Sequence, residues 1–447
     1  MKNEVLEKLE SDYFDAIHLS AQLKKKIFSD IKSGILLNRK HLEKLITEEI
    51  KLTQKDAVRE VERAIETFAL AEKNAKYAIK KRIEKNGKII TEQNTARGPL
   101  LAITPFSSPL SSPAHKIALG ILSGTSVLFK PSRHAKLTGN AFFKIVRKAT
   151  KGKYVYFCDK SGKKLDDILS DERIGIISFT GSYEIGERII KKGGVKKYHM
   201  ELSGGNSSVI FTPDYQNFSS ELVDKLFNGI LAKNGQRCVS IKHIFVSKEQ
   251  TKFLETFLSR LDYIKQEIES DLENGKKKIL GPMITQSSAL LLEKKVGNIL
   301  RKYHRKITPF IKIERKEDFI YPSAYKVVNF DRNLVKNILS YDLSGPVLFF
   351  YVYKNLAEYQ EVIKGFERDY IRSGIQLSFF TNKISEIPNL VKNIVWGGIV
   401  VNEIPTLRDE FMSFGGFGRA GIGKEGFFET VQAYTDPKII AYNAKTQ

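Results

Sequence analysis

Apolar residues in the first part of the chain recur at the spacing of a helix. Leu42, Leu45, Ile46 and Ile50 fall on one helical face, with charged residues between them. A second run of this kind extends from Ala57 to Ile83. The pattern therefore predicts amphipathic helices through residues 1–85, each packed by one face against the rest of the protein.

From about residue 88 the pattern changes to short apolar runs that alternate with helical runs. Strand-like runs cover 126–132, 153–159 and 173–182, and runs at helical spacing cover 138–150 and 182–194. A second alternating series begins after residue 203. Such alternation predicts an α/β fold with a doubly wound parallel sheet, which binds ligands at the carboxyl ends of its strands.

Charge and cysteine content narrow the class of protein. The 447 residues carry a formal net charge of +22, but Lys and Arg are spread along the chain, as on solvated helix faces. No zinc-finger spacing or aromatic-interleaved basic stripe accompanies them, so nucleic acid is a disfavoured partner. Two cysteines are too few for a disulfide scaffold, and the charged amino terminus lacks the apolar core of a signal peptide. No apolar run is long enough to span a bilayer, so we expect a soluble, cytoplasmic protein.

Two glycine patterns resemble nucleotide motifs without their context. Residues 416–421 fit G-x-G-x-x-G but lie near the carboxyl terminus, with no βαβ unit to follow. Residues 418–424 begin a P-loop pattern, in which Glu425 replaces the required Ser or Thr. We interpret both as one flexible Gly-rich loop. The histidines at 115, 134 and 199 show no ligand spacing, so no metal site is predicted.

Cys238 and Glu201 are the candidates for chemistry. Cys238 lies in "NGQRCVS", a polar turn between a helix and a strand, where a thiol can be both reachable and partly ionised. A lone cysteine is still more often a packing residue, and Cys158, in an apolar run, is interpreted as one. Glu201 ends a short strand beside two glycines, a position that suits a general base but also a surface acid.

Together these segments resemble the aldehyde dehydrogenase superfamily, in the same order along the chain. The branch with the most similar motifs is that of the lactaldehyde and semialdehyde dehydrogenases. The resemblance rests on "TPFSSPL" (104–110), "LFKPS" (128–132), "FTGSYEIG" (179–186), "MELSGGN" (200–206), "NGQRCVS" (234–240), "GPMI" (281–284), "YDLSGPV" (341–347) and the segment 402–426.

The resemblance implies roles for three residues in catalysis. Cys238 would attack the aldehyde to give a thiohemiacetal and, after hydride transfer, a thioester, and Glu201 would activate the water that hydrolyses it. The oxyanion that forms needs preset donors. The backbone N–H of Cys238 is one, and the family's asparagine is the other, but here Ser107 takes its place. Losing an oxyanion donor costs about 2.7–4 kcal/mol of barrier, so Ser107 predicts low turnover unless Ser108, water or another side chain fills the gap.

The resemblance also implies a dinucleotide site. Where NAD-preferring members often carry a glutamate that repels a 2′-phosphate, this chain has Arg133, which can pair with that phosphate. NADP is therefore the predicted cofactor, with NAD possible; the alternative for Arg133 is a solvated helix entry. At the nicotinamide end, Asp342 stands for a glutamate and Ser344 for a phenylalanine. The implied cofactor residues are Lys130, Ser132, Arg133, Gly181, Ser182, Gly186 and Asp342.

The implied fold has a cofactor-binding domain (1–83 and 99–203), a catalytic domain (204–426) and a bridging element (84–98 and 427–447). The bridging element would combine a hairpin with the final strand "KIIAYN" and form a homodimer or homotetramer. The expected activity is oxidation of a small, hydroxylated or anionic aldehyde. For Arg408 a structural ion pair is favoured over contact with the substrate. The alternatives are a non-catalytic binding homologue, a CoA-acylating enzyme and a nucleic-acid binder.

Overall fold

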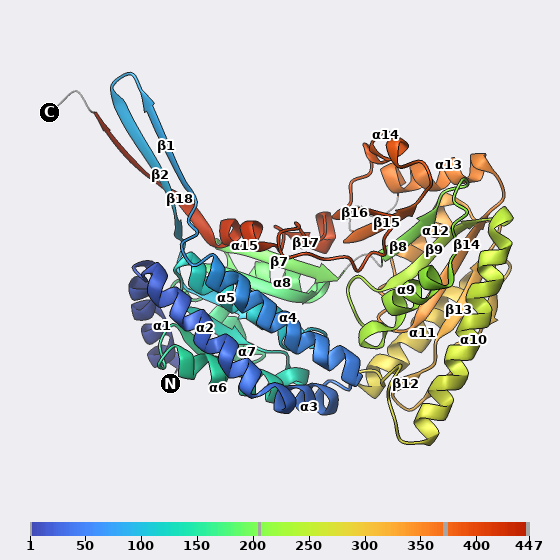
Figure 1. Cartoon of the computed structure of the whole chain (residues 1–447), viewed down its shortest axis with the longest axis horizontal. Coiled ribbons are helices and arrows are strands. Elements are labelled where there is room, and N and C mark those ends of the chain that lie inside the picture. The colour runs from blue at the N-terminus through green and yellow to red at the C-terminus, as the bar shows by residue number, and fades with distance from the viewer. Residues whose placement is uncertain (1, 204–206, 370–373, 444–447) are drawn as a thin grey trace.

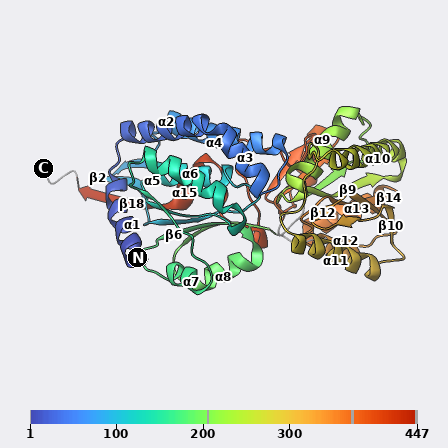
Figure 2. The ribbon, with the colours of Figure 1, turned by 90° about the horizontal axis from the view of Figure 1, so that it is seen from below.

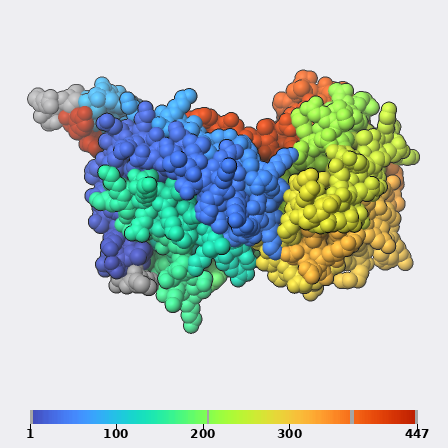
Figure 3. Space-filling model, turned by 60° about the horizontal axis from the view of Figure 1, so that its bottom comes forward, coloured from blue at the N-terminus to red at the C-terminus, as the bar shows by residue number. Residues whose placement is uncertain are grey.

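The computed structural model describes residues 2–203, 207–369 and 374–443. Two α/β parts lie side by side, and a narrow three-stranded sheet extends away from one of them (Figure 1). The surfaces of the two parts meet along an extended boundary (Figure 3). Gly204 and Gly205 of the predicted general-base segment lie outside the described residues.

The amino-terminal region is helical, as its apolar spacing predicts, but the helix expected to reach Ile83 ends ten residues earlier. Thr53 caps α4 by accepting from the N–H of Asp56 at 3.2 Å, and the helix ends at Lys73. Residues 80–85 instead form an exposed strand, because pairing with the next strand of the hairpin (residues 88–96) outweighs the weak helical pattern there. The helices are α1 (Lys2–Ile17), α2 (Ala21–Leu37), α3 (Arg39–Glu49) and α4 (Gln54–Lys73).

A six-stranded sheet of order β17-β7-β6-β3-β4-β5 forms the core of the first part. Its strands are parallel except for β17, which returns from the carboxyl-terminal region antiparallel to β7. Helices α5 and α6 cover one face, and α7 and α8 cover the other (Figure 2). The elements are β3 (Leu100–Ile103), β4 (Val127–Lys130), β5 (Val155–Phe157), β6 (Ile176–Ser182), β7 (Lys197–Ser203), β17 (Gly421–Ile422), α5 (Ser111–Ser123), α6 (Lys136–Ala149), α7 (Lys163–Leu169) and α8 (Tyr183–Gly193).

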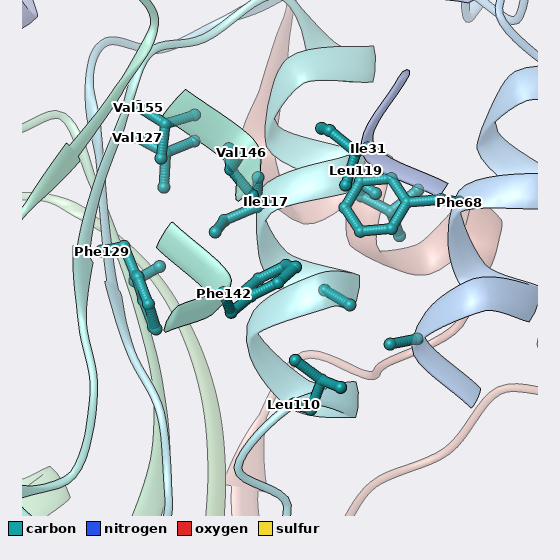
Figure 4. Packing of buried hydrophobic residues seen from close by; sticks show 14 of the residues in the cluster. Ile31, Phe68, Leu110, Ile117, Leu119, Val127, Phe129, Phe142, Val146 and Val155 are labelled. Atoms are coloured by element: carbon teal, nitrogen blue, oxygen red, sulfur yellow. The ribbon is translucent and has the colours of Figure 1, made fainter. Parts of the chain in front are cut away.

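The larger hydrophobic core of this part joins the sheet to the amino-terminal helices. Phe129 of β4 contacts Phe142 of α6 edge to face, and Phe142 in turn contacts Phe68 of α4 (Figure 4). Ile117 of α5 lies between these layers and is fully buried. The amphipathic helices thus hold the strands whose carboxyl ends carry the predicted site residues.

A seven-stranded sheet of order β10-β13-β14-β9-β8-β15-β16 forms the second part. It is parallel except for β10, with α9 and α10 on one face and α11, α12 and α13 on the other. A two-stranded pair, β11 (Arg315–Lys316) and β12 (Phe319–Ile320), lies beside it. The other elements are β8 (Ser207–Phe211), α9 (Ser220–Leu231), β9 (Ile241–Ser247), α10 (Thr251–Glu273), α11 (Gln286–Lys302), β10 (Ile307–Ile311), β13 (Ser323–Val327), α12 (Arg332–Leu339), β14 (Val347–Tyr353), α13 (Leu356–Lys364), β15 (Gln376–Phe380), α14 (Ile387–Val391) and β16 (Gly398–Val401).

The protruding sheet has the order β1-β2-β18 and is mostly exposed. β18 pairs antiparallel with β2 along its whole length, from Thr435 opposite Ala96 to Asn443 opposite Lys88. The segment "KIIAYN" therefore does join the hairpin, but the hairpin begins at residue 80 rather than 84. The strands are β1 (Lys80–Lys85), β2 (Lys88–Ala96) and β18 (Thr435–Asn443), and α15 (Phe427–Tyr434) leads into β18.

Candidate active site

A cavity of about 490 Å³ lies where the two parts meet. The first part lines it with the carboxyl ends of β3, β4, β6 and β7, as expected of a doubly wound sheet. The second part contributes residues 236–238, Asp342 and Ser344. Of the predicted site residues Gly186 alone does not line it; those that do are Ser107, Lys130, Ser132, Arg133, Gly181, Ser182, Glu201, Cys238 and Asp342.

The turn that carries Cys238 (residues 232–240, hereafter the Cys238 turn) is held by side-chain contacts. Lys233 and Asn234 adopt left-handed backbone conformations, with φ of 55° and 59°. Asn234 donates to the carbonyls of Lys51 and Pro282 and accepts from the N–H of Gly281 at 2.7 Å. These bonds hold the left-handed backbone of Asn234 in place, within the turn that presents the candidate nucleophile Cys238.

Cys238 is exposed to the cavity although protein surrounds it on most sides. This burial raises the pKa of its thiol, and Glu201 raises it further, whereas Arg237 and Arg408 oppose the rise. Its backbone N–H makes no hydrogen bond within the described part of the chain, so it is free to donate to a ligand. Cys158 is buried in the core of the first sheet, as expected.

Glu201, on β7, is only 6% exposed. Burial and the nearby Glu425 raise the pKa of its carboxyl well above the usual range. Its Oε1 has no hydrogen-bond partner among the described residues. Gly415 lies against it so closely that a Cβ there would be 2.4 Å from Oε1. A carboxyl that is desolvated, unpartnered and next to a cavity is poised to exchange a proton with a bound molecule.

Buried charges that the sequence did not single out as functional surround Glu201. Glu425 pairs with Arg408 at 2.7 Å and with Lys116 at 3.4 Å. Although burial opposes it, these two cations hold the pKa of Glu425 well below the usual range. The ion pair predicted for Arg408 is therefore present. Glu425 remains an anion that disfavours ionisation of Glu201.

Three arginines lie near Glu201 and Cys238, and Arg237 differs from Arg63 and Arg408 in its lack of an acidic partner among the described residues. Arg63, on α4, pairs with Glu410 at 3.6 Å, and Arg408 pairs with Glu425. The side chain of Arg237 has no acidic group within 4.0 Å and no hydrogen bond within the described part of the chain. Because it lines the cavity beside Cys238, it leaves one positive charge free for a ligand.

The loop after β3 brings Ser107 and Ser108 to the same cavity. Ser108 Oγ accepts from the ammonium of Lys233 at 2.9 Å, and Lys233 also pairs with the buried Glu60. The Ser107 side chain makes no hydrogen bond among residues 2–203, 207–369 and 374–443. Its hydroxyl can therefore turn toward a ligand.

The remaining predicted residues lie at the ends of β4 and β6. Ser132 caps a short 3₁₀ turn that begins at Arg133, and Ser182 caps α8 by accepting from the N–H of Ile185. Lys130 ends β4, and burial lowers the pKa of its ammonium. Gly186 allows close packing instead, since a Cβ there would be 2.4 Å from Leu202 Cδ2. Two cationic side chains and the N-terminus of α8 fit the phosphates of a dinucleotide.

Asp342 enters the cavity from the second part. Its carboxylate accepts from the hydroxyl of Ser344 at 2.8 Å, and its carbonyl accepts from Lys295 Nζ at 2.7 Å. Ser344 thus orients Asp342. No cluster of three or more metal-binding side chains occurs in the described residues, and none of their helices is long and apolar enough to cross a bilayer.

Comparison with known proteins agrees with this geometry. The model of the aldehyde dehydrogenase family matches residues 11–440. A lactaldehyde dehydrogenase of Methanococcus aeolicus is 28% identical over 96% of this chain and 89% of its own. A 3-sulfolactaldehyde dehydrogenase of Priestia megaterium is 24% identical over 92% of this chain and 84% of its own.

Solved structures share the fold. The glyceraldehyde-3-phosphate dehydrogenase GapN of Methanocaldococcus jannaschii, complexed with NADP, has a TM-score of 0.87 at 27% identity and covers 99% of this chain and 94% of its own. Aldehyde dehydrogenase 21 of Physcomitrella patens, complexed with succinate, has a TM-score of 0.88 at 23% identity and covers 100% and 92%. The predicted doubly wound α/β architecture is confirmed.

Proposed function

The chain belongs to the aldehyde dehydrogenase family and is an NAD(P)-dependent enzyme that oxidises aldehydes, and from that premise we propose which of its residues carry the reaction. The observation that carries the proposal is the meeting of Cys238 and Glu201 in one cavity, at the carboxyl ends of the first sheet. The substrate is a short aldehyde, and the product is its carboxylic acid.

The first step is attack by Cys238 on the aldehyde carbon. The thiol releases its proton to solvent, a carbon–sulfur bond forms, and the carbonyl oxygen becomes an oxyanion as the C=O π bond breaks. The free N–H of Cys238 donates to that oxygen, and the unpartnered hydroxyl of Ser107 is the second donor. The high pKa of the thiol keeps the thiolate fraction low at neutral pH, so Arg237 and Arg408 act as its electrostatic support.

The second half of the reaction releases the acid. NADP, when bound, would accept the hydride that the substrate carbon loses as the oxyanion re-forms a carbonyl, so that the substrate remains as a thioester of Cys238. Glu201 then takes a proton from water, which attacks the thioester carbon and releases the carboxylic acid and the Cys238 thiol. A carboxyl with a raised pKa is a stronger base once ionised, which suits Glu201 to this step.

NADP is the preferred cofactor. Lys130 and Arg133 offer two positive side chains at the end of β4, and Arg133 has no acidic partner within the described part of the chain. Its guanidinium is therefore available to a 2′-phosphate. Ser132, Gly181 and Ser182 would contact the diphosphate, and Asp342 would bind the nicotinamide ribose.

The substrate carries an anionic or hydroxylated tail. Arg237 supports this proposal, because it is an unpaired guanidinium in the cavity beside Cys238. The names of the similar proteins agree with it: they act on lactaldehyde, on 3-sulfolactaldehyde and on glyceraldehyde 3-phosphate. A short aldehyde with a hydroxyl next to the carbonyl and a carboxylate, sulfonate or phosphate beyond it fits these groups.

The protruding sheet is the bridging element of a homodimer or homotetramer. Among the described residues β18 has no strand paired to its outer edge, and it exposes Ile439, Ile440 and Tyr442. An exposed strand edge with apolar side chains is suited to pairing with a second copy. The enzyme works in the cytoplasm, in keeping with its two free cysteines.

The test is to follow NADPH absorbance with a panel of short aldehydes, for the wild type and for Cys238→Ala. We expect the wild type to reduce NADP with at least one aldehyde and Cys238→Ala to reduce none. No reduction with any aldehyde would favour a non-catalytic binding protein. Coenzyme A added to the same assay distinguishes the acceptors, because a rate that depends on coenzyme A would mean that water is not the acceptor of the acyl group.

A further inference from the structure

Lys242, on β9, is a buried cation that the proposed chemistry does not use. Its side chain is 1% exposed, and no acidic group lies within 4.0 Å of its ammonium in the described part of the chain. Burial lowers the pKa of this ammonium to about 7. A cation without an acidic partner is costly to keep inside a protein, and an apolar side chain of similar length would fill the same space.

The partners of Lys242 are two backbone carbonyls that belong to different segments of the active site. Its Nζ donates to the carbonyl of Gly235 at 2.8 Å and to the carbonyl of Gly345. Gly235 lies in the Cys238 turn. Gly345 lies three residues after Asp342, the proposed contact of the nicotinamide ribose. We call Lys242 and these two carbonyls the Lys242 clamp.

The two segments are in direct backbone contact at the clamp. The N–H of Gly345 donates to the carbonyl of Gly235 at 2.9 Å. A Cβ added to Gly235 would lie 2.5 Å from the carbonyl carbon of Gly345, so no side chain separates the segments. Gly235 and Gly345 are therefore joined both by a backbone hydrogen bond and through Lys242.

We propose that Lys242 is a positioning residue that couples dinucleotide binding at Asp342 to the placement of Cys238. The proposal rests on the cofactor role proposed for Asp342. The clamp holds the segment that contacts the cofactor against the turn that presents the thiol. Dinucleotide binding at Asp342 then changes the reactivity of the Cys238 thiol.

The test measures alkylation of Cys238 by iodoacetamide with and without saturating NADP, and needs no aldehyde. In the wild type we expect NADP to change the alkylation rate by about fivefold or more. Lys242→Met should bring the ratio of the two rates to within about twofold of one and raise the Kd of NADP, measured by titration. Lys242→Gln keeps amide donors for both carbonyls and should retain part of the coupling.

The matched control is Lys24→Met. Lys24 is a partly buried lysine whose ammonium donates to a single carbonyl, that of Leu122, and it does not line the cavity. The Lys24→Met variant should leave the ratio of the alkylation rates with and without NADP unchanged. A thermal melt of each variant identifies a loss of folding; if Lys242→Met fails to fold, Lys242→Gln decides.

The outcomes separate this inference from the proposed function. Coupling that persists at the wild-type ratio in a folded Lys242 variant would overturn the inference, because it would show that the cofactor acts on the thiol without Lys242, by direct contact or through the backbone bond between Gly345 and Gly235. The inference would also be overturned if NADP did not change the alkylation rate of Cys238 in the wild type. Coupling that depends on Lys242, in a protein that oxidises no aldehyde, would support the inference and refute the proposed function.

Discussion

Replacing Arg237 with methionine tests the proposed substrate class, because methionine keeps most of the side-chain length and removes the charge. Arg63 and Arg408 are already paired with Glu410 and Glu425, so Arg237 is the one guanidinium of the three that is free to bind an anionic tail. A hydrogen bond to a charged group contributes about 1.5–3 kcal/mol. Its loss should lower kcat/KM for an anionic aldehyde about 10- to 150-fold.

The same substitution has a second effect, which a neutral aldehyde isolates. Arg237 lowers the pKa of the Cys238 thiol against the effect of burial. Arg237→Met should therefore raise the pKa of that thiol and move the pH profile of its alkylation to higher pH. This change affects every aldehyde equally. The ratio of kcat/KM for glyceraldehyde 3-phosphate to that for glyceraldehyde consequently reports the contact with the anion alone.

The assay follows NADPH absorbance for both aldehydes, with Arg188→Met as the control. Arg188 lines the same cavity, but both oxygens of Asp166 already hold its guanidinium at 2.8 Å. The control should leave the ratio unchanged. The reasoning is refuted if Arg237→Met lowers the rates for the charged and the neutral aldehyde by the same factor, because Arg237 would then act only through the thiol.

Three further predictions follow from the same site. Ser107→Asn should raise kcat and Ser107→Ala should lower it, with the gap between them approaching the roughly 2.7–4 kcal/mol of one oxyanion donor; equal rates would remove Ser107 from the reaction. Arg133→Glu should move the ratio of kcat/KM for NADP to that for NAD by about tenfold or more toward NAD, and an unchanged ratio would contradict the proposed phosphate contact. A raised carboxyl pKa makes the folded state lose stability as pH rises above 4.5, the usual value, toward the pKa in the fold. Thermal melts of Glu201→Gln and the wild type should therefore diverge in favour of the variant across this pH range, and parallel melts would contradict the burial of an ionisable Glu201.

Motifs in the sequence were enough to predict nine of the residues that line the cavity, although they did not single out Arg237. Cys238 and Glu201 lie in short segments whose order along the chain identifies the family, and strand ends are predictable from the alternation of strands and helices. The interpretation of residues 416–424 as one flexible loop was wrong in part, because Gly418–Ala420 form a 3₁₀ turn and Gly421 begins β17, which pairs with β7. Lys424 from the same region ties this loop by donating to the carbonyls of Gly415 and Gly416.

The residues that tune the site could not be predicted in the same way. Lys116 lies in an apolar helix and meets Glu425, which is 309 positions away, so no local pattern relates them. Lys242 lies within a strand and looks like one more charge in a basic chain. The end of α4 was placed too late, because the strand pairing that begins at Lys80 depends on Gln93, which lies across the hairpin. These contacts are set by the tertiary fold.

The most direct test of the account is to trap the acyl group on Cys238. Glu201→Gln is mixed with aldehyde and NADP, quenched with acid, and analysed by mass spectrometry of the peptide that contains Cys238. We predict one burst of NADPH per active site, together with a thioester on that cysteine. Steady formation of NADPH without an adduct, or full activity in Cys238→Ala, would contradict covalent catalysis at Cys238.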